Sequence, residues 1–120
     1  MQDATMEKAR DLGRLIGQTD EYQALQRARQ RLSDDREVVG LVNRVAELEQ
    51  AIARSLQRGE APEESVREEY EQVVSQLQAS PVYQGLVAAQ ANFDRVLGRV
   101  NEEIANGMEA AAKSRIILPS

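Results

Sequence analysis

The side chains that carry out most acid–base and metal chemistry in proteins are missing from this sequence. Its 120 residues include no histidine and no cysteine. Without imidazole, no side chain titrates near neutral pH at its ordinary pKa, and the commonest metal ligand is absent. Without a thiol there is no thiolate nucleophile, no zinc or iron–sulfur ligand and no disulfide. Catalysis would therefore rest on serine, lysine, tyrosine or carboxylate groups alone.

The carboxylates are the remaining candidates for a metal or acid–base site, and their spacing is typical of a solvated helix surface. Di-iron helical bundles use Glu-x-x-His pairs that face the core, and this pair cannot form without histidine. The glutamates considered lie beside or between the apolar positions of helical repeats: Glu63, Glu64, Glu68, Glu69, Glu71, Glu102 and Glu103. We therefore expect no metal, no cofactor and no enzymatic activity.

An acidic stretch in the middle of the chain allows two interpretations. Six glutamates and one arginine lie between Glu60 and Glu71. Glutamates at the start of a helix compensate its dipole and keep the surface solvated. The same charges could instead form a docking face for a basic partner, and the sequence leaves both interpretations open.

The densest basic cluster lies earlier in the chain. Arg27 and Arg31 are spaced to share one helix face, while Arg29 points away from it. Acidic neighbours follow closely, and no aromatic residue is interleaved to stack on bases. The net charge of −5 also argues against a general affinity for nucleic acid. We expect Arg27 and Arg31 to face a protein partner or to form salt bridges, with RNA binding as the alternative function.

Apolar residues recur at helical spacing along nearly the whole chain, and no stretch alternates with the period of a strand. This pattern predicts an all-α, single-domain bundle of about five helices, in which the third and fifth helices are long. Helix ends are expected at Gly17, at Ser33–Asp35, at 57–62 and at Ser80-Pro81. Thr19 or Asp20 is expected to cap the second helix, Ser33 to cap the third and Ser80 to cap the last.

The region around Gly59 is expected to end the third helix and begin the fourth. Glycine tolerates the left-handed conformation that commonly follows a helix C-terminus. Pro62 fits the first turn of the next helix, where its missing N–H breaks no hydrogen bond. Pro81 fits the same position in the last helix.

Two apolar stripes run along the last helix. The first is expected to pack inside the domain and consists of Val82, Leu86, Ala89, Phe93, Val96 and Val100. The second extends beyond what a compact bundle must cover and forms a candidate oligomer interface: Leu97, Ile104, Met108 and Ala111. An amphipathic helix lying on a membrane is less favoured, because the flanks lack a Lys/Arg-rich polar face.

The predicted bundle domain covers residues 1–112, and residues 113–120 form a tail that is either disordered or docked on a neighbour. No run of about 20 apolar residues offers a membrane span. The N-terminus lacks the basic region and apolar stretch of a signal peptide. We therefore expect a cytoplasmic protein.

The order of motifs over about residues 6–106 resembles a known family. The first motifs are Ala9-x-x-Leu12-x-x-x-Ile16 and Thr19-x-Glu21-Tyr22-x-x-Leu25-x-x-Ala28-x-x-x-Leu32-x-x-Asp35. The later ones are Gln57-x-Gly59, Ser80-Pro81-Val82, Leu86-x-x-Ala89 and Val100-Asn101-x-x-Ile104. Their ordered succession resembles the YlbF/YmcA family of small bacterial regulators. Most matched positions are packing or capping residues, so the succession carries more weight than any single motif.

The resemblance implies an all-α fold of about five helices that self-associates as a homodimer or a higher oligomer. It implies a regulatory partner protein and a link to ribonuclease Y, messenger-RNA processing, competence, sporulation and biofilm formation. Some members are linked to iron–sulfur clusters through cysteines. This chain has no cysteine, so that role is not expected here. The family has no catalytic motif to transfer.

Overall fold

A computed structural model describes residues 2–117 of the chain. This part is all-α and contains no strand. Its five helices are α1 (Gln2–Gly17), α2 (Asp20–Asp34), α3 (Arg36–Gln57), α4 (Glu64–Gln78) and α5 (Pro81–Ile117). The third and fifth helices are the longest, with 22 and 37 residues. The predicted fold class is therefore confirmed.

A single capping side chain marks each junction between the first three helices. Thr19 is the N-cap of α2, and its hydroxyl oxygen accepts a hydrogen bond from the backbone N–H of Tyr22 at 3.2 Å. The same hydroxyl donates to the carbonyl of Ile16 at the end of α1. The expectation that Ser33 caps α3 is wrong, because Asp35 is the cap and accepts from the N–H of Val38 at 3.1 Å, while the Ser33 hydroxyl donates to the carbonyl of Arg29 within α2. Each cap satisfies an N–H that has no partner within the helix.

Gly59 ends α3 as expected. It follows the C-cap residue Arg58 and has φ +74°, in the left-handed region. The N–H of Glu60 donates to the carbonyl of Ser55 at 2.9 Å, and the N–H of Gly59 donates to the carbonyl of Leu56 at 3.0 Å. These two bonds are the pair that defines a Schellman motif.

The two prolines differ in position. Pro81 is the first residue of α5, and the Ser80 hydroxyl oxygen accepts from the N–H of Tyr83 at 3.3 Å, as predicted. The expectation that Pro62 lies in the first turn of α4 is wrong. Glu63 has an extended ψ of 142° and stands as the N-cap, so α4 begins only at Glu64. Glu63 makes no side-chain capping bond.

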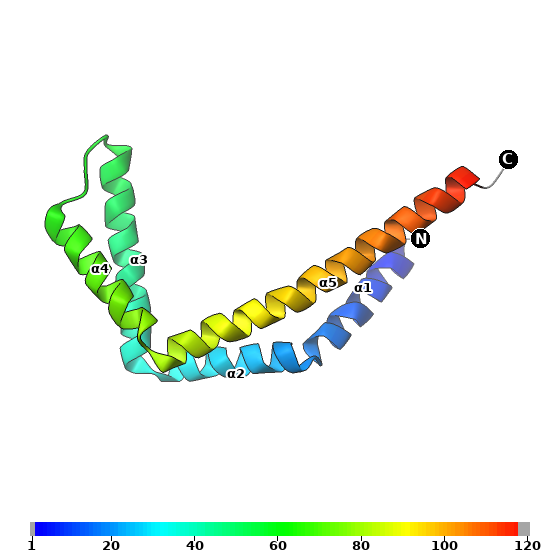
Figure 1. Cartoon of the computed structure of the whole chain (residues 1–120), viewed down its shortest axis with the longest axis horizontal. Helices are drawn as coiled ribbons and strands as arrows, with labels where there is room; N and C mark the ends of the chain where they lie inside the picture. The colour runs from blue at the N-terminus through cyan, green and yellow to red at the C-terminus, as the bar shows by residue number, and fades with distance from the viewer. Residues whose placement is uncertain (1, 118–120) are drawn as a thin grey trace.

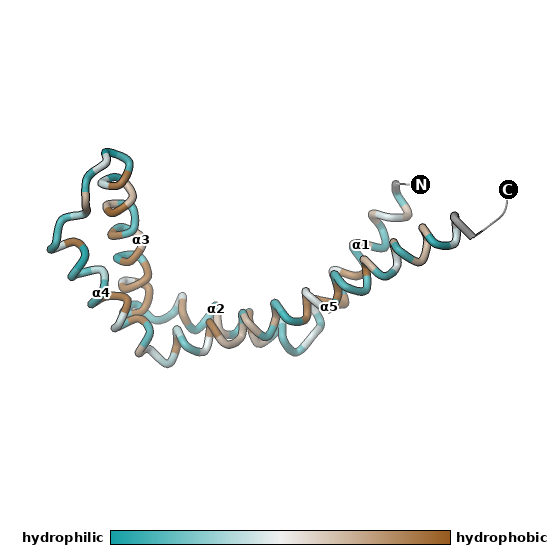
Figure 2. The backbone as a smooth tube through the Cα atoms, turned by 45° about the horizontal axis from the view of Figure 1, so that its top comes forward, coloured by the Kyte–Doolittle hydropathy of each residue, from teal (hydrophilic) through white to brown (hydrophobic). Residues whose placement is uncertain are grey.

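The helices pack in pairs that form two arms (Figure 1). In the α2/α5 arm, α2 lies along the first half of α5, and in the α3/α4 arm those two helices lie side by side. The arms meet at an elbow, where Asp35 joins α2 to α3 and Ala79-Ser80 joins α4 to α5. Figure 2 shows hydrophobic residues along α3 and along the shared length of α2 and α5.

Each arm has its own small core. In the α2/α5 arm, Leu25 and Ala28 are buried against Ala89 and Phe93. The Tyr22 ring packs on Phe93 with centroids 5.2 Å apart. In the α3/α4 arm the buried residues are Val38, Leu48, Val73 and Leu77. An exposed ion pair, Arg44 with Glu69, joins α3 to α4 through two hydrogen bonds of 2.6 Å.

The paired packing makes the molecule long. Its radius of gyration is 21.8 Å, and it extends over 70 × 38 × 23 Å. A compact domain of this length has a radius of gyration of about 14 Å. Every helix therefore has at least one side with no neighbour in the chain.

The last helix continues past residue 112 to Ile117, so no break in secondary structure marks the expected start of the tail. Residues 118–120 of that tail lie outside the described residues. The division at residue 112 stays a prediction. Among the helices of residues 2–117, none is long and apolar enough to cross a membrane.

Candidate protein-protein interface

An apolar side of α5 remains uncovered because α5 is much longer than the helix that packs on it. The helix α2 has 15 residues and α5 has 37. Ala89 and Phe93 are buried beneath α2, whereas Val96 and Val100 are only half-buried. Residues 101–114 are all exposed. The apolar repeat of α5 therefore continues beyond the part of the helix that α2 covers.

The first helix covers this remaining part only partly. Ile16, near the C-terminal end of α1, packs against the core of the α2/α5 arm, whereas the N-terminal end of α1 lies apart from α5 (Figure 2). Leu12 and Ile16 are half-buried, whereas residues 3–10 are exposed. Met6 in particular is 55% exposed. An open groove is left between α1 and α5.

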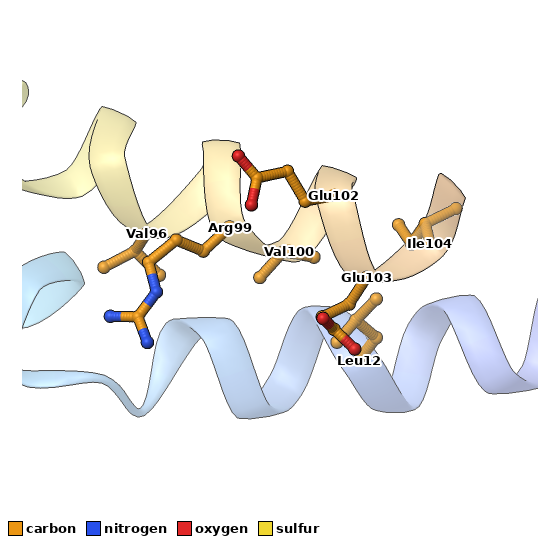
Figure 3. A pocket seen from close by; sticks show the side chains of 7 residues that line it. All are labelled: Leu12, Val96, Arg99, Val100, Glu102, Glu103 and Ile104. Atoms are coloured by element: carbon orange, nitrogen blue, oxygen red, sulfur yellow. The ribbon is translucent and has the colours of Figure 1, made fainter. Parts of the chain in front are cut away.

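This groove has a volume of about 790 Å³ and an apolar floor. Its floor consists of Leu12 from α1 and Val96, Val100 and Ile104 from α5. Charged side chains lie around it: Arg99, Glu102 and Glu103. In Figure 3, Arg99 and Glu103 extend into the gap between the two helices, while Glu102 points away from α1. An apolar floor with a charged rim is the usual composition of a protein-protein contact.

The four predicted interface residues are not equivalent in the structure. Leu97 is half-buried and packs against the core of its own chain. Ile104 and Met108 are 45% and 65% exposed, and Ala111 is exposed too. Three of the four are therefore accessible to another molecule, and Leu97 connects them to the core. Their role as an interface stays a prediction.

The predicted arginine pair lies at the surface of α2. Arg27 and Arg31 are both exposed. Arg29, between them in sequence, turns toward α5 and donates to the side-chain oxygen of Gln90 at 3.5 Å. This arrangement matches the prediction that Arg29 leaves the face shared by the other two.

Ionisable groups in the described residues are arranged as surface charges. The buried side chains of residues 2–117 include none that is polar or charged. Within the same residues, no cluster of three or more His, Cys, Asp or Glu could hold a metal ion. Hydrogen bonds from Arg44 lower the pKa of Glu69, and the same ion pair raises the pKa of Arg44. Both lie on the α3/α4 arm, away from the groove.

The groove and some exposed apolar residues do not follow from the sequence pattern. That pattern places Val96 and Val100 in the interior, yet they line the groove. The exposed apolar residues that no stripe identifies are Leu15 and Val87. The signal for the groove is the difference in helix length, because a short second helix cannot cover the apolar face of the long last one.

Residues 5–109 match the sequence profile of a family described as control of competence regulator ComK, YlbF/YmcA. That range includes α2, α3 and α4 completely and most of α1 and α5. No curated protein sequence matches the chain.

Proposed function

The chain belongs to the YlbF/YmcA family, and on this premise we propose that it is a regulatory protein that works by binding other proteins and catalyses no reaction. The family is described by its control of the competence regulator ComK, which is a regulatory role. The observation that supports a binding role here is the uncovered apolar face of α5. Large apolar surfaces that a chain leaves open are typical of interaction sites.

Self-association is the first interaction that we propose. The radius of gyration of 21.8 Å shows that one chain does not bury its helices as a compact domain does. A homodimer or higher oligomer that covers Ile104, Met108 and Ala111 would bury the exposed part of the apolar stripe. Each large apolar side chain removed from water contributes about 1.5–3 kcal/mol when its burial is complete.

Binding of a second, different protein is the next level of the proposal. By analogy with the family, the partner is another regulatory protein or a ribonuclease Y complex in the cytoplasm. The regulated process would then be messenger-RNA processing or a developmental switch such as competence, sporulation or biofilm formation. Shared family membership supports this analogy, although related folds host different roles.

The test is to place charge on the apolar stripe and to measure both mass and partner binding. Ile104→Asp combined with Met108→Asp should lower the mass in solution to that of one chain and reduce recovery of partners by at least about tenfold, since buried unpaired carboxylates are strongly unfavourable. Asn106→Asp with Ala110→Asp is the matched control on the same helix, because both residues are exposed outside the stripe.

The result that would contradict the proposal is equally direct. If the unmodified protein has the mass of a single chain at high concentration and recovers no reproducible partner, a binding role is excluded. Substrate turnover by the purified protein alone would exclude the non-catalytic assignment.

A further inference from the structure

A second face of α5 has heptad spacing and is exposed along its whole length in the part of the chain that the structure describes. Successive positions on it are separated alternately by four and three residues, the spacing that packs one helix along another. We call it the Gly98 face; its members are Val87, Ala91, Asp94, Gly98, Asn101, Ala105, Met108 and Ala112. All eight are exposed. At about 100° per residue, this face lies beside the one that α2 covers.

The two ends of the Gly98 face have complementary shapes. Near one end, a groove of about 450 Å³ lies beside Val87 and has an apolar floor that includes Leu86 and Ala91. Near the other end, Met108 is 65% exposed. Val87 itself is 50% exposed. A flexible methionine side chain is well suited to fill an irregular apolar groove of this kind.

The Gly98 face has nearly the same order of residues in both chain directions. Ala91 and Ala105 are equally far from Gly98 in sequence. Farther out, the number of residues between Val87 and Gly98 equals the number between Gly98 and Met108 to within one. In a two-fold symmetric contact each residue meets its counterpart in the second copy, so a self-complementary face of this kind suits an antiparallel helix pair.

Charges beside the face obey the same symmetry. Arg95 and Glu102 lie on one flank of it, on opposite sides of Gly98 and nearly equidistant from it. Both are exposed. Within its own chain Arg95 donates a hydrogen bond to the Asn92 amide oxygen, which carries no charge. A second copy running antiparallel would place its glutamate opposite this arginine, and the reverse pair would form at the same time.

From this charge and shape complementarity we propose that two copies of the chain pack antiparallel along their Gly98 faces, with the two-fold axis at Gly98. The proposal rests on the self-association proposed above and specifies its geometry. Met108 of each copy enters the groove beside Val87 of the other, and Ala91 meets Ala105. Beside the axis, the Asn101 amide of one copy can donate to the Asp94 carboxylate of the other, and Arg95 pairs with Glu102. The flanking residues Ile104 and Leu97 extend the apolar contact.

In such a pair, a glycine at residue 98 would have a structural role. A glycine within a helix weakens it relative to alanine. Inside the chain, nothing lies within 4 Å of the position that a Cβ of residue 98 would occupy. At the crossing point of two helices, the missing side chain allows their backbones to come close.

The absence of cysteine makes a disulfide test free of background. Ala91→Cys and Ala105→Cys chains, mixed and oxidised, should form a cross-linked dimer, because a disulfide requires Cα atoms about 4.4–6.8 Å apart. Either variant alone should cross-link at least about tenfold less, since equal residues lie far apart in an antiparallel pair. Ala91→Cys mixed with Ala110→Cys is the control, because Ala110 is exposed on another side of α5.

Each outcome separates this geometry from self-association in general. Equal cross-linking of the single variants with themselves would indicate parallel packing and refute the proposal. A dimer mass for the unmodified protein, without cross-linking of the mixture above the control, would refute the Gly98 face while self-association stands. A single-chain mass at all concentrations would refute both.

A charge exchange gives an independent check without cysteine. Arg95→Glu should raise the dissociation constant of the dimer by about tenfold, because it places two glutamates opposite each other. Adding Glu102→Arg to the same chain should restore most of the affinity, since the pairs are then reversed. Arg54→Glu, an exposed reversal on the other arm, should leave the constant unchanged. Failure of the double variant to recover would overturn the proposed pairing.

Discussion

Single residues decide where the helices of this chain end, and Gly59 does so through its backbone alone. At φ +74° it adopts a conformation that costs residues with a side chain about 1–2 kcal/mol. No atom lies within 4 Å of its Cβ position, so packing does not contribute to this preference. A substitution at residue 59 therefore tests the effect of backbone strain on stability without a change in packing.

Gly59→Ala should lower the free energy of unfolding by about 1 kcal/mol through this strain. Gly40→Ala should have the opposite sign and raise it by about 0.5–1 kcal/mol, because residue 40 lies within α3 and its Cβ would also meet nothing. Urea unfolding followed by circular dichroism measures both. Equal effects of the two substitutions would show that α3 does not end in a left-handed glycine.

The ion pair between Arg44 and Glu69 gives stability a defined pH dependence. The arginine lowers the pKa of Glu69 in the folded chain. A carboxyl group whose folded pKa is lowered stabilises the fold above its unfolded pKa and loses that effect as pH falls through the folded pKa. The melting temperature should therefore fall below about pH 4.5. Glu69→Gln should reduce this acid-dependent part slightly, since the pair is exposed and its contribution small.

At the scale of elements, the contact between α2 and α5 depends mainly on one side chain. Leu25 of α2 is 1% exposed and packs with Ala89 and Phe93 of α5. Leu25→Ala should lower the free energy of unfolding by about 2–5 kcal/mol. Leu25→Met, which keeps the volume, should cost less than about 1.5 kcal/mol. Leu15→Ala, at a site 62% exposed, should stay within about 0.5 kcal/mol.

The helix ends and the helix pairing differ in how far the sequence predicts them. Helix ends follow from local chemistry, so the amino-acid pattern alone indicates caps at Thr19, Ser80 and the cluster that ends in Asp35. The pattern misplaces Pro62 because Glu63 has an extended backbone, and the spacing of side chains in the sequence does not indicate that conformation. The apolar repeats identify the side of each helix that packs, but not which helix packs there. The division into two arms is therefore a property of tertiary packing.

The candidate interface is likewise predicted by the sequence in part and set by tertiary packing in part. Ile104, Met108 and Ala111 belong to a stripe that extends beyond what a compact bundle must cover. They are therefore predicted to lie at the surface, and they are exposed. Leu97 belongs to the same repeat, yet it lies within reach of α2 and packs on the core. The groove beside Leu12 depends on the angle at which α1 leaves α5, and tertiary packing sets that angle.

At the scale of the whole molecule, the proposed self-association would stabilise two narrow arms that each have a small core. A chain that is folded mainly as part of an oligomer becomes more stable as its concentration rises, because mass action favours the assembled state. With a radius of gyration of 21.8 Å, this chain leaves apolar side chains of α5 exposed that the proposed association would cover. Stability and assembly would then be measured by the same experiment.

The melting temperature should rise with protein concentration if the arms are covered by a second copy. A hundredfold increase stabilises a dimer by about 2.7 kcal/mol relative to its unfolded chains. This corresponds to roughly 5–10 °C for a unit of this size. The variant with Ile104→Asp and Met108→Asp should melt at one temperature at every concentration, and below the unmodified protein. If the unmodified chain also melts at one temperature across that range, its extended fold is stable alone, and the exposed apolar face of α5 serves a different partner.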